Sequence, residues 1–203
     1  MYFNELARKW DTDIRIERGK LLAKSIYKNI ELKKDITALE IGCGTGLITM
    51  ELREILKEIY CTDISKEMLK VLKEKIEKYK ADNIHLINNE AVYKEEFYKY
   101  FDLIYSSMVF HHIEDIEKEL CKIYKILKRN GILIIIDLDE DDGSFHKDEE
   151  EFRGYNGFNR ETLKIILEKQ RFKKIKFETV FRGEKKTKDK LIQYSLFLCI
   201  AKI

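Results

Sequence analysis

The sequence predicts a doubly wound α/β fold, with a mostly parallel sheet of seven strands that ends in an antiparallel hairpin. Strand-like and helix-like segments alternate along most of the chain, which is typical of a parallel sheet covered by helices. A glycine-rich turn follows the first strand, and two long strand-like segments close the chain with only a charged stretch between them. Since the 203 residues contain no low-complexity linker, we expect one domain, residues 1–203.

The expected strands are short apolar runs. The fifth is apolar throughout, as expected for a strand that is buried on both faces. The seven runs span residues 37–41, 59–62, 84–87, 101–106, 132–136, 175–181 and 191–203. The charged stretch at residues 183–190 suits a hairpin turn, so the last two strands are expected to pair in antiparallel fashion.

Apolar residues recur at helical spacing between the strands. The expected helices cover residues 14–30, a stretch from 47 to before 58, and the segments that begin after 65, at 116 and after 159. Ser65 and Asn159 stand where their side chains can cap the helix that follows. Asn130 and Gly131 are expected to end the helix before the fifth strand, because both tolerate the left-handed conformation of a C-cap. Residues 1–34 are expected to form a helical lid region.

Composition argues against several classes of function. Lys and Arg (39) nearly balance Asp and Glu (37), and the net charge of +2 gives no general basis for nucleic-acid binding. None of the four cysteines lies in a CxxC pair, so we expect free thiols in the reducing cytoplasm and no zinc site of that type. No apolar run reaches the ~20 residues that span a bilayer, and the N-terminus lacks an apolar signal core.

The segment LEIGCGTG at residues 39–46 is the most informative one, because it joins the first strand to a helix. Glycines there allow a tight turn and let backbone N–H groups approach a ligand. Asp63 follows the second strand, where a carboxylate can accept hydrogen bonds from both hydroxyls of a ribose. Leu47 stands where a dinucleotide fingerprint requires Gly or Ala, and no G-x-x-x-x-G-K-[ST] loop is present. The ligand is therefore expected to be nucleotide-like without being a dinucleotide or a nucleoside triphosphate.

These segments resemble a known family. LEIGCGTG is similar to motif I of the class I S-adenosylmethionine-dependent methyltransferases, and YCTDIS at residues 60–65 is similar to their second motif. The likeness continues through FDLIYSSMVFHHIED at residues 101–115 and ILKRNGILIIID at residues 126–137. It implies a Rossmann-like fold with S-adenosyl-L-methionine as cofactor.

The resemblance also implies which residues hold the cofactor. Its methionine part would lie against the glycine turn, its ribose against Asp63, and its adenine near residues 64–68 and the pair 90–91. The implied cofactor-binding residues are Trp10, Glu40, Gly42, Cys43, Gly44, Gly46, Asp63, Ile64, Met68, Glu90, Ala91 and Ser106. Glu90 departs from the Asp that usually precedes this Ala. A narrower likeness, carried by ARKWD, SSMVFHHIED, DLDEDDGSFH and GFNRETL, is to an uncharacterised bacterial and fungal subgroup in which the segment with Trp10 lies over the cofactor.

His111 and His112 are the candidate catalytic residues, since they follow the fourth strand at the rim where ligands bind in open α/β sheets. Either could accept a proton from the acceptor, or the imidazoles could only cap backbone groups at a helix entry. A metal ion held with His146 and the acids of residues 137–142 is a third option. We expect no metal, because an acidic loop is usually solvated.

Two aromatic groups each have two interpretations. Tyr2, Phe3 and Trp10 could cover the sulfonium, which favours aromatic faces, or could pack the first helix onto the sheet. The glycine-containing loop at residues 139–158 could be an active-site lid or a fixed cover of the core.

The predicted function is transfer of a methyl group from S-adenosylmethionine to an O, N or S atom of a small-molecule acceptor by a monomer or weak homodimer. Nucleic acid and membrane are not expected as partners. One alternative is an RNA or protein methyltransferase that uses the lysines of residues 185–190 as a basic contact. Another is a regulatory protein that binds the cofactor without transferring its methyl group, because fold alone does not decide function.

Overall fold

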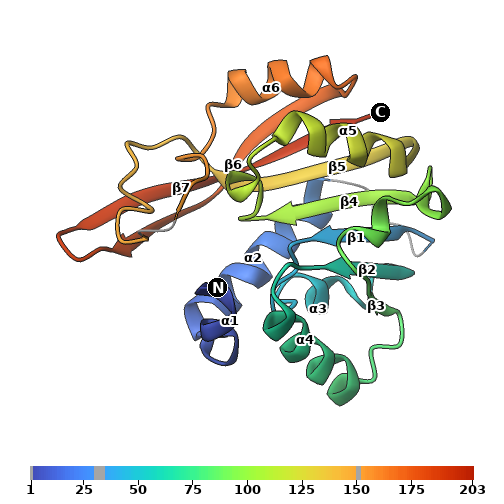
Figure 1. Ribbon diagram of the computed structural model, residues 1–203, viewed down its shortest axis with the longest axis horizontal. Coiled ribbons are helices and arrows are strands. Elements are labelled where there is room, and N and C mark those ends of the chain that lie inside the picture. Colours follow the sequence, from blue (N-terminus) through green and yellow to red (C-terminus); the bar gives the residue numbers. More distant parts are fainter. Residues whose placement is uncertain (1, 30–34, 150–151) are drawn as a thin grey trace.

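Seven strands form one sheet in the order β3-β2-β1-β4-β5-β7-β6 (Figure 1). The computed structural model describes residues 2–29, 35–149 and 152–203. The strands are β1 (Thr37–Ile41), β2 (Glu58–Thr62), β3 (Ile84–Leu86), β4 (Phe101–Ser107), β5 (Leu127–Leu138), β6 (Lys173–Lys186) and β7 (Leu191–Lys202). The first five strands pair in parallel, whereas β7 runs antiparallel to both β5 and β6. The predicted mostly parallel sheet with a closing antiparallel hairpin is confirmed.

Helices cover both faces of this sheet. One core contains residues of α2 (Asp13–Asn29), α3 (Thr49–Leu52) and α4 (Lys66–Tyr79), and the other contains residues of α5 (Ile116–Ile126) and α6 (Arg160–Lys169). Residues of β5 enter these cores alternately, because successive side chains of a strand point to opposite faces. Residues 132–136 of β5 are therefore all apolar.

Short elements complete the chain. They are α1 (Tyr2–Leu6) and the 3-10 helices η1 (Ala7–Lys9), η2 (Ala91–Tyr93), η3 (Glu95–Phe97) and η4 (Phe110–His112). The predicted first helix is α2 up to Asn29, whereas residues 30–34 of the predicted helix and lid region lie outside the described residues. Among the described residues, no helix combines the length and the apolar character that a membrane span requires.

The two predicted helix caps are present. The hydroxyl of Ser65 accepts the backbone N–H of Met68 at 3.2 Å at the start of α4. The side-chain oxygen of Asn159 accepts the backbone N–H of Thr162 at 3.2 Å at the start of α6. Each cap satisfies a backbone donor that has no partner within its helix.

The predicted role of Asn130 and Gly131 as a helix C-cap is wrong. α5 ends at Ile126, and the chain enters β5 directly at Leu127. Asn130 has a φ of 67° inside β5, where the pairing with β4 shifts register. The left-handed residue therefore forms an irregularity within a strand, a conformation that Asn tolerates equally well.

Two other boundaries differ from the prediction. α3 spans only Thr49–Leu52. The side-chain amide of Asn83 donates to the carbonyl groups of Arg53 and Leu56 at 2.8 and 3.1 Å, so these bonds take the place of helical hydrogen bonds. β6 extends through the predicted turn as far as Lys186, so the charged residues belong mostly to a long hairpin.

The site lies at the point where the order of the strands in the sheet reverses, between β1 and β4. The connection after β1 leads to α3 on one face, and the connection after β4 leads to α5 on the other. The connections that leave the carboxyl ends of these neighbouring strands therefore turn to opposite faces and leave a crevice between them. Ligands bind in this crevice in open α/β sheets.

Candidate active site

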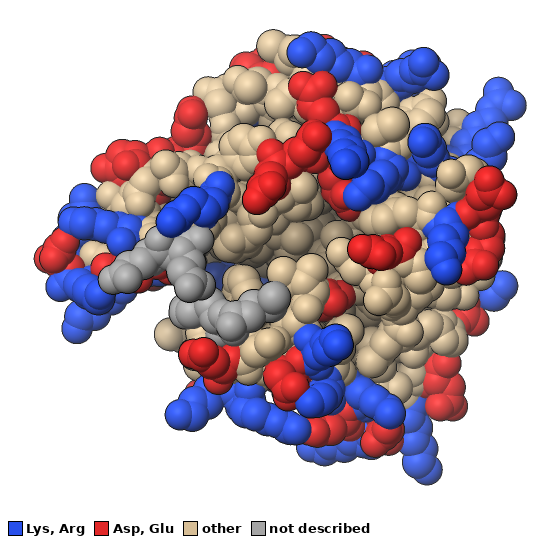
Figure 2. All heavy atoms as spheres, in the orientation of Figure 1, with Lys and Arg blue, Asp and Glu red and all other residues tan. Residues whose placement is uncertain are grey.

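A cavity of about 380 Å³ lies at the carboxyl ends of β1, β2 and β4, where the surface is hollowed (Figure 2). This volume is within the range of pockets that bind small molecules. Most of the predicted site residues line it: Trp10, Glu40, Gly42, Cys43, Gly44, Asp63, Ile64, Met68 and His112. Residues from separate parts of the sequence thus converge on one cavity.

The turn after β1 presents backbone to the cavity. Gly42, Gly44 and Gly46 have φ angles of 69°, 54° and 78°, in the left-handed region that favours glycine. A Cβ atom at Gly42 would lie 2.3 Å from Val109, and one at Gly46 would lie 2.4 Å from Leu72. A Cβ atom at Gly44 would meet nothing within 4 Å. Gly42 and Gly46 therefore allow close packing, whereas Gly44 borders open space that a ligand can occupy.

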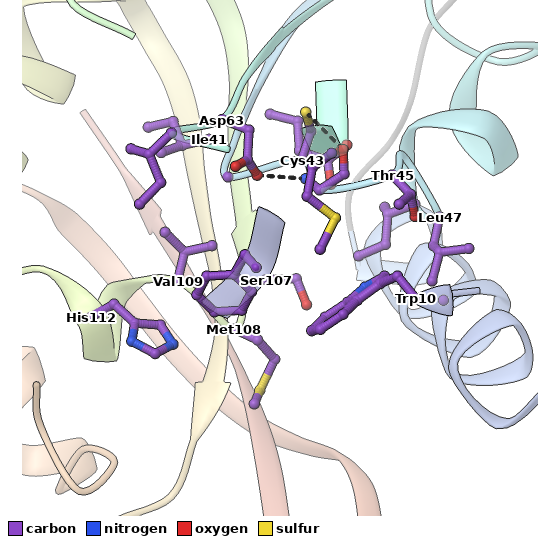
Figure 3. A pocket seen from close by; sticks show the side chains of 18 of the residues that line it. Trp10, Ile41, Cys43, Thr45, Leu47, Asp63, Ser107, Met108, Val109 and His112 are labelled. Atoms are coloured by element: carbon purple, nitrogen blue, oxygen red, sulfur yellow. Dashed lines mark hydrogen bonds between the residues drawn. The ribbon is translucent and has the colours of Figure 1, made fainter. Parts of the chain in front are cut away.

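Asp63 is held by backbone N–H groups of two loops. Gly44 donates to Oδ2 and Ser65 donates to Oδ1, each at 2.7 Å, and the first of these bonds is drawn in Figure 3. Burial raises the pKa of the Asp63 carboxyl, and the two N–H groups oppose this effect. Each oxygen keeps a further lone pair, so the fixed carboxylate can still accept hydrogen bonds from two neighbouring hydroxyls.

Glu40 is buried beneath the glycine turn and is only 3% exposed. Its Oε2 accepts hydrogen bonds from the Tyr105 hydroxyl at 3.0 Å and from the Thr49 hydroxyl. Burial raises the pKa of Glu40 to about 7, although both hydroxyls favour the ionised form. The carboxyl is therefore partly protonated at neutral pH, and a cation in the cavity would favour its ionised form.

The segment that contains Trp10 is fixed to the glycine turn and to α4. The Thr45 hydroxyl donates to Asp11 Oδ1 at 2.5 Å, and Lys75 Nζ lies 2.6 Å from Asp11 Oδ2. The guanidinium group of Arg15 lies 4.0 Å from the centroid of the Trp10 ring. These contacts hold the indole ring at the edge of the cavity.

Phe3 connects the two sides of the cavity rim. Its ring contacts Trp10 and His112 edge-on, with centroid separations of 5.8 and 5.6 Å. Phe3 and Trp10 both line the cavity, whereas the side chain of Tyr2 lies outside the described part of the structure. The N-terminal aromatic residues thus border the site as well as packing against one another.

The histidine pair after β4 is divided between the cavity and the core. His112 is half-buried and lines the cavity across from Trp10 (Figure 3). His111 is 1% exposed; its Nδ1 lies 2.5 Å from Asp137 Oδ1, and its backbone N–H donates to Asp137 Oδ2 at 3.2 Å. Burial lowers the pKa of His112 to about 4, so its imidazole is neutral near pH 7. Of this pair, His112 is the one placed to contact a ligand.

The acidic segment after the fifth strand is not simply solvated, so that expectation is wrong for two of its members. Asp137 is fully buried against His111. Asp139 binds Arg160 with an Nε–Oδ1 distance of 2.7 Å and accepts a hydrogen bond from Ser195 at 2.6 Å. The reason is that β5 extends to Leu138, so that Asp137 lies within the sheet.

The loop that joins β5 to α6 packs as a cover over the histidine pair. Phe145 and Phe158 are 8% and 6% exposed, and Lys185 Nζ donates to the Phe145 carbonyl at 2.5 Å. The backbone N–H of Tyr155 donates to the His111 carbonyl at 2.7 Å. The described residues of this loop, 139–149 and 152–158, therefore pack around the histidine pair, and residues 150 and 151 lie outside the described part of the structure.

Comparisons with known proteins point to one family. Residues 39–135 match the methyltransferase domain family. An uncharacterised methyltransferase of Schizosaccharomyces pombe is 33% identical over 125 residues, which is 58% of this chain and 44% of that protein. The ubiquinone biosynthesis O-methyltransferase of Pelagibacter ubique is 27% identical over 129 residues, which is 61% of this chain and 53% of that protein. The chain spans about half the length of these curated relatives.

Residues 39–135 of the chain are therefore similar to a methyltransferase domain. Solved methyltransferase structures share its fold. An S-adenosylmethionine-dependent methyltransferase from Aquifex aeolicus has a TM-score of 0.71 at 20% identity and 98% coverage of both chains. Phosphoethanolamine N-methyltransferase 2 of Haemonchus contortus, solved with S-adenosyl-L-methionine, has a TM-score of 0.73 at 19% identity, covering 89% of this chain and 52% of that one.

Other residues that the methyltransferase resemblance singled out do not border the cavity: Gly46, Glu90, Ala91, Ser106 and His111. Ser106 donates from Oγ to the Ile41 carbonyl at 2.9 Å, and Ser107 lines the cavity instead, because neighbouring side chains of a strand point to opposite faces. Asn89 lines the cavity as well, whereas Glu90 is exposed at the start of η2.

Sequence motifs did not reveal the contribution of α2. Arg15, Arg18, Gly19 and Leu22 all line the cavity and follow the spacing of one helix face. A Cβ atom at Gly19 would lie 2.9 Å from Leu47 Cβ, so α2 lies close to the glycine turn. The spacing was visible in the sequence, but two arginines on a helix face are equally typical of a solvated surface.

We expect Gly44→Ala to affect ligand binding more than folding. Left-handed backbone costs an alanine about 1–2 kcal/mol, and the new methyl group projects into the open space of the cavity. Gly42→Ala is the matched control, because its methyl group meets Val109 instead and should destabilise the protein more. Denaturation and calorimetric titration with S-adenosylmethionine measure the two effects, and wild-type affinity in Gly44→Ala would contradict this placement.

We expect Glu40 to make stability depend on pH. Because its pKa rises from 4.5 to about 7 on folding, the folded state binds more protons between these values, and stability is lost as pH rises through this window. The difference corresponds to roughly 3 kcal/mol. Denaturation of the cofactor-free protein at pH 5 and pH 8 should show a smaller change in Glu40→Gln than in the wild type. The exposed Glu96→Gln should behave like the wild type, and an unaltered pH response in Glu40→Gln would refute the assignment.

Proposed function

We propose that this chain transfers a methyl group from S-adenosylmethionine to an O, N or S atom of a small-molecule acceptor. The observation that carries the proposal is that one cavity joins the glycine turn and Asp63 at one part to His112 at another (Figure 3). A cofactor site and a polar side chain for the acceptor are thus contiguous.

The residues of the cavity suit this cofactor. Asp63 offers two fixed oxygens to the hydroxyls of a ribose, and Gly44 leaves open space beside the turn. Trp10 offers an indole face, which attracts a cation such as a sulfonium group. Ile64 and Met68 supply an apolar wall beside Asp63 for a planar base.

When bound, S-adenosylmethionine supplies a methyl group that is already activated by the sulfonium. The task of the chain is to align the acceptor atom with that methyl group and to exclude water. Phe3 and Trp10 narrow the cavity from the N-terminal side, and His112 is the imidazole through which the acceptor atom is engaged. His111 supports this region from the core and does not itself line the cavity.

A small-molecule acceptor is favoured over RNA because the chain has a net charge of only +2 and one lysine of the hairpin is paired with an acid. Lys185 Nζ lies 3.0 Å from Glu149 Oε1. The ribosomal RNA small subunit methyltransferase A of Mesomycoplasma hyopneumoniae matches only 79 residues, 38% of this chain. The ubiquinone biosynthesis O-methyltransferase and a malonyl-[acyl-carrier protein] O-methyltransferase of Bacillus cytotoxicus match 61% and 65% of it.

A cytoplasmic location and a monomer or weak homodimer are also part of the proposal. The four cysteines are all free thiols, which supports a reducing compartment. A protein that binds the cofactor without methyl transfer is the second candidate. A mitochondrial arginine-hydroxylase of Mus musculus is 32% identical over 127 residues, so a related domain also occurs in a protein named for another reaction.

Incubation with labelled S-adenosylmethionine and cell extract tests the proposal. We expect a labelled small-molecule product and formation of S-adenosylhomocysteine. Asp63→Ala should bind the cofactor ~10- to 100-fold more weakly, the scale of hydrogen bonds to a charged group. Asp82→Ala, at an exposed position before β3, is the control and should bind normally. Cofactor binding without turnover would support the regulatory alternative, and equal binding by Asp63→Ala would remove Asp63 from the site.

We expect His112→Ala to separate acceptor chemistry from cofactor binding. The glycine turn and Asp63 are unchanged in this variant, so cofactor affinity should stay within about twofold. Turnover with the extract-derived acceptor should fall on the order of 10²-fold or more, as for a group that contacts the reacting atoms. His85→Ala, on β3 and bonded to Glu58, should retain normal turnover. Full turnover by His112→Ala would show that the ring does not engage the acceptor.

A further inference from the structure

Three of the four histidines in the chain meet beside the cavity, where the loop after β5 folds over η4. One ring nitrogen each of His111, His112 and His146 lies within 4.8 Å of the other two. Two nitrogens bound to one ion at 2.0–2.1 Å lie up to ~4 Å apart, so small ring movements bring all three into coordination. His112 is the member that also lines the cavity.

His111 is prepared as a ligand by a buried carboxylate. Its Nδ1 lies 2.5 Å from Asp137 Oδ1, and both residues are at most 1% exposed. Donation of the Nδ1 proton to Asp137 leaves the lone pair on Nε2, and a carboxylate in this position orients metal-binding imidazoles in known proteins. The negative charge of Asp137 also offsets positive charge at the centre of the cluster.

His146 has a buried nitrogen without a partner. The residue is 5% exposed, and its Nδ1 lacks a hydrogen-bond partner among the described residues. Its ring stacks on Phe152 with a centroid separation of 3.7 Å, so the side chain is held in place by packing.

We propose that His111, His112 and His146 bind a divalent transition metal ion, with Zn²⁺ as the best match. Three imidazoles with one open position are a known catalytic zinc arrangement, and nitrogen ligands favour zinc over magnesium or calcium. His112 lines the cavity, so an ion held by the three rings would lie beside it. This proposal departs from the expectation of no metal, which was based on the acidic loop.

The role of the ion rests on the proposed function. An acceptor hydroxyl or thiol that occupies the open position loses its proton to water, because a bound Zn²⁺ stabilises the anion. The lone pair of that oxygen or sulfur then forms the bond to the methyl carbon. The bond between this carbon and the sulfonium breaks with its electron pair moving to sulfur, which leaves a neutral thioether. His112 thus engages the acceptor through the ion.

The experiment measures Zn²⁺ binding by tag-free protein in competition with a chromogenic chelator, independently of methyl transfer. We expect one Zn²⁺ per chain. His146→Phe keeps a ring to stack on Phe152 but offers no ligand, so affinity should fall by about 10²-fold or more. His85→Ala removes the one histidine outside the cluster and should bind like the wild type. Co²⁺ should give visible absorption in the wild type and His85→Ala, and weaker absorption in His146→Phe.

The variants also show which proposal fails. Thermal unfolding and calorimetry with S-adenosylmethionine establish that His146→Phe is folded and binds the cofactor. Wild-type Zn²⁺ affinity in His146→Phe, equal losses in His146→Phe and His85→Ala, or no stoichiometric Zn²⁺ at all would overturn the metal site. Any of these results beside intact methyl transfer would leave the proposed function standing.

Discussion

The hydrogen bond from the Gly44 N–H to the Asp63 carboxylate joins the ends of β1 and β2, and the cavity depends on it. The bond requires the left-handed backbone of the glycine turn, which in turn is anchored to β2 by the Gly42 and Cys43 N–H groups on the Thr62 carbonyl at 2.8 and 2.9 Å. The same carboxylate is then available to a ligand. One group therefore shapes the turn and serves the site.

Two other buried carboxyl groups flank the site in different electrostatic settings. Glu40 is surrounded by neutral hydroxyls, so its burial is only partly offset and its proton is held up to about pH 7. Asp137 contacts an imidazole and a backbone N–H, which are stronger partners for a negative charge. A buried carboxyl is costly without such partners.

Much of the fold could be predicted from the sequence because its signals are local. The apolar run of β5, the caps at Ser65 and Asn159, and the long closing strands depend on residue type and spacing alone. Asn130 shows the limit of such signals. Its tolerance for left-handed backbone was correctly recognised, but the same conformation occurs at a helix end and in an irregular strand, and only pairing with β4 decides between them.

The sequence by itself determined the sheet, the glycine turn and its acid, because these depend on local residue patterns and on backbone conformations that few residue types adopt. Only the tertiary structure decided which side chains reach the cavity. Ser107 rather than Ser106 borders it, because neighbouring side chains of a strand point to opposite faces. His112 rather than His111 borders it, because η4 turns the His111 ring towards Asp137 in the core. The approach of His146 to this pair depends on how a long loop closes over η4, and loop closure is set by contacts between segments distant in sequence.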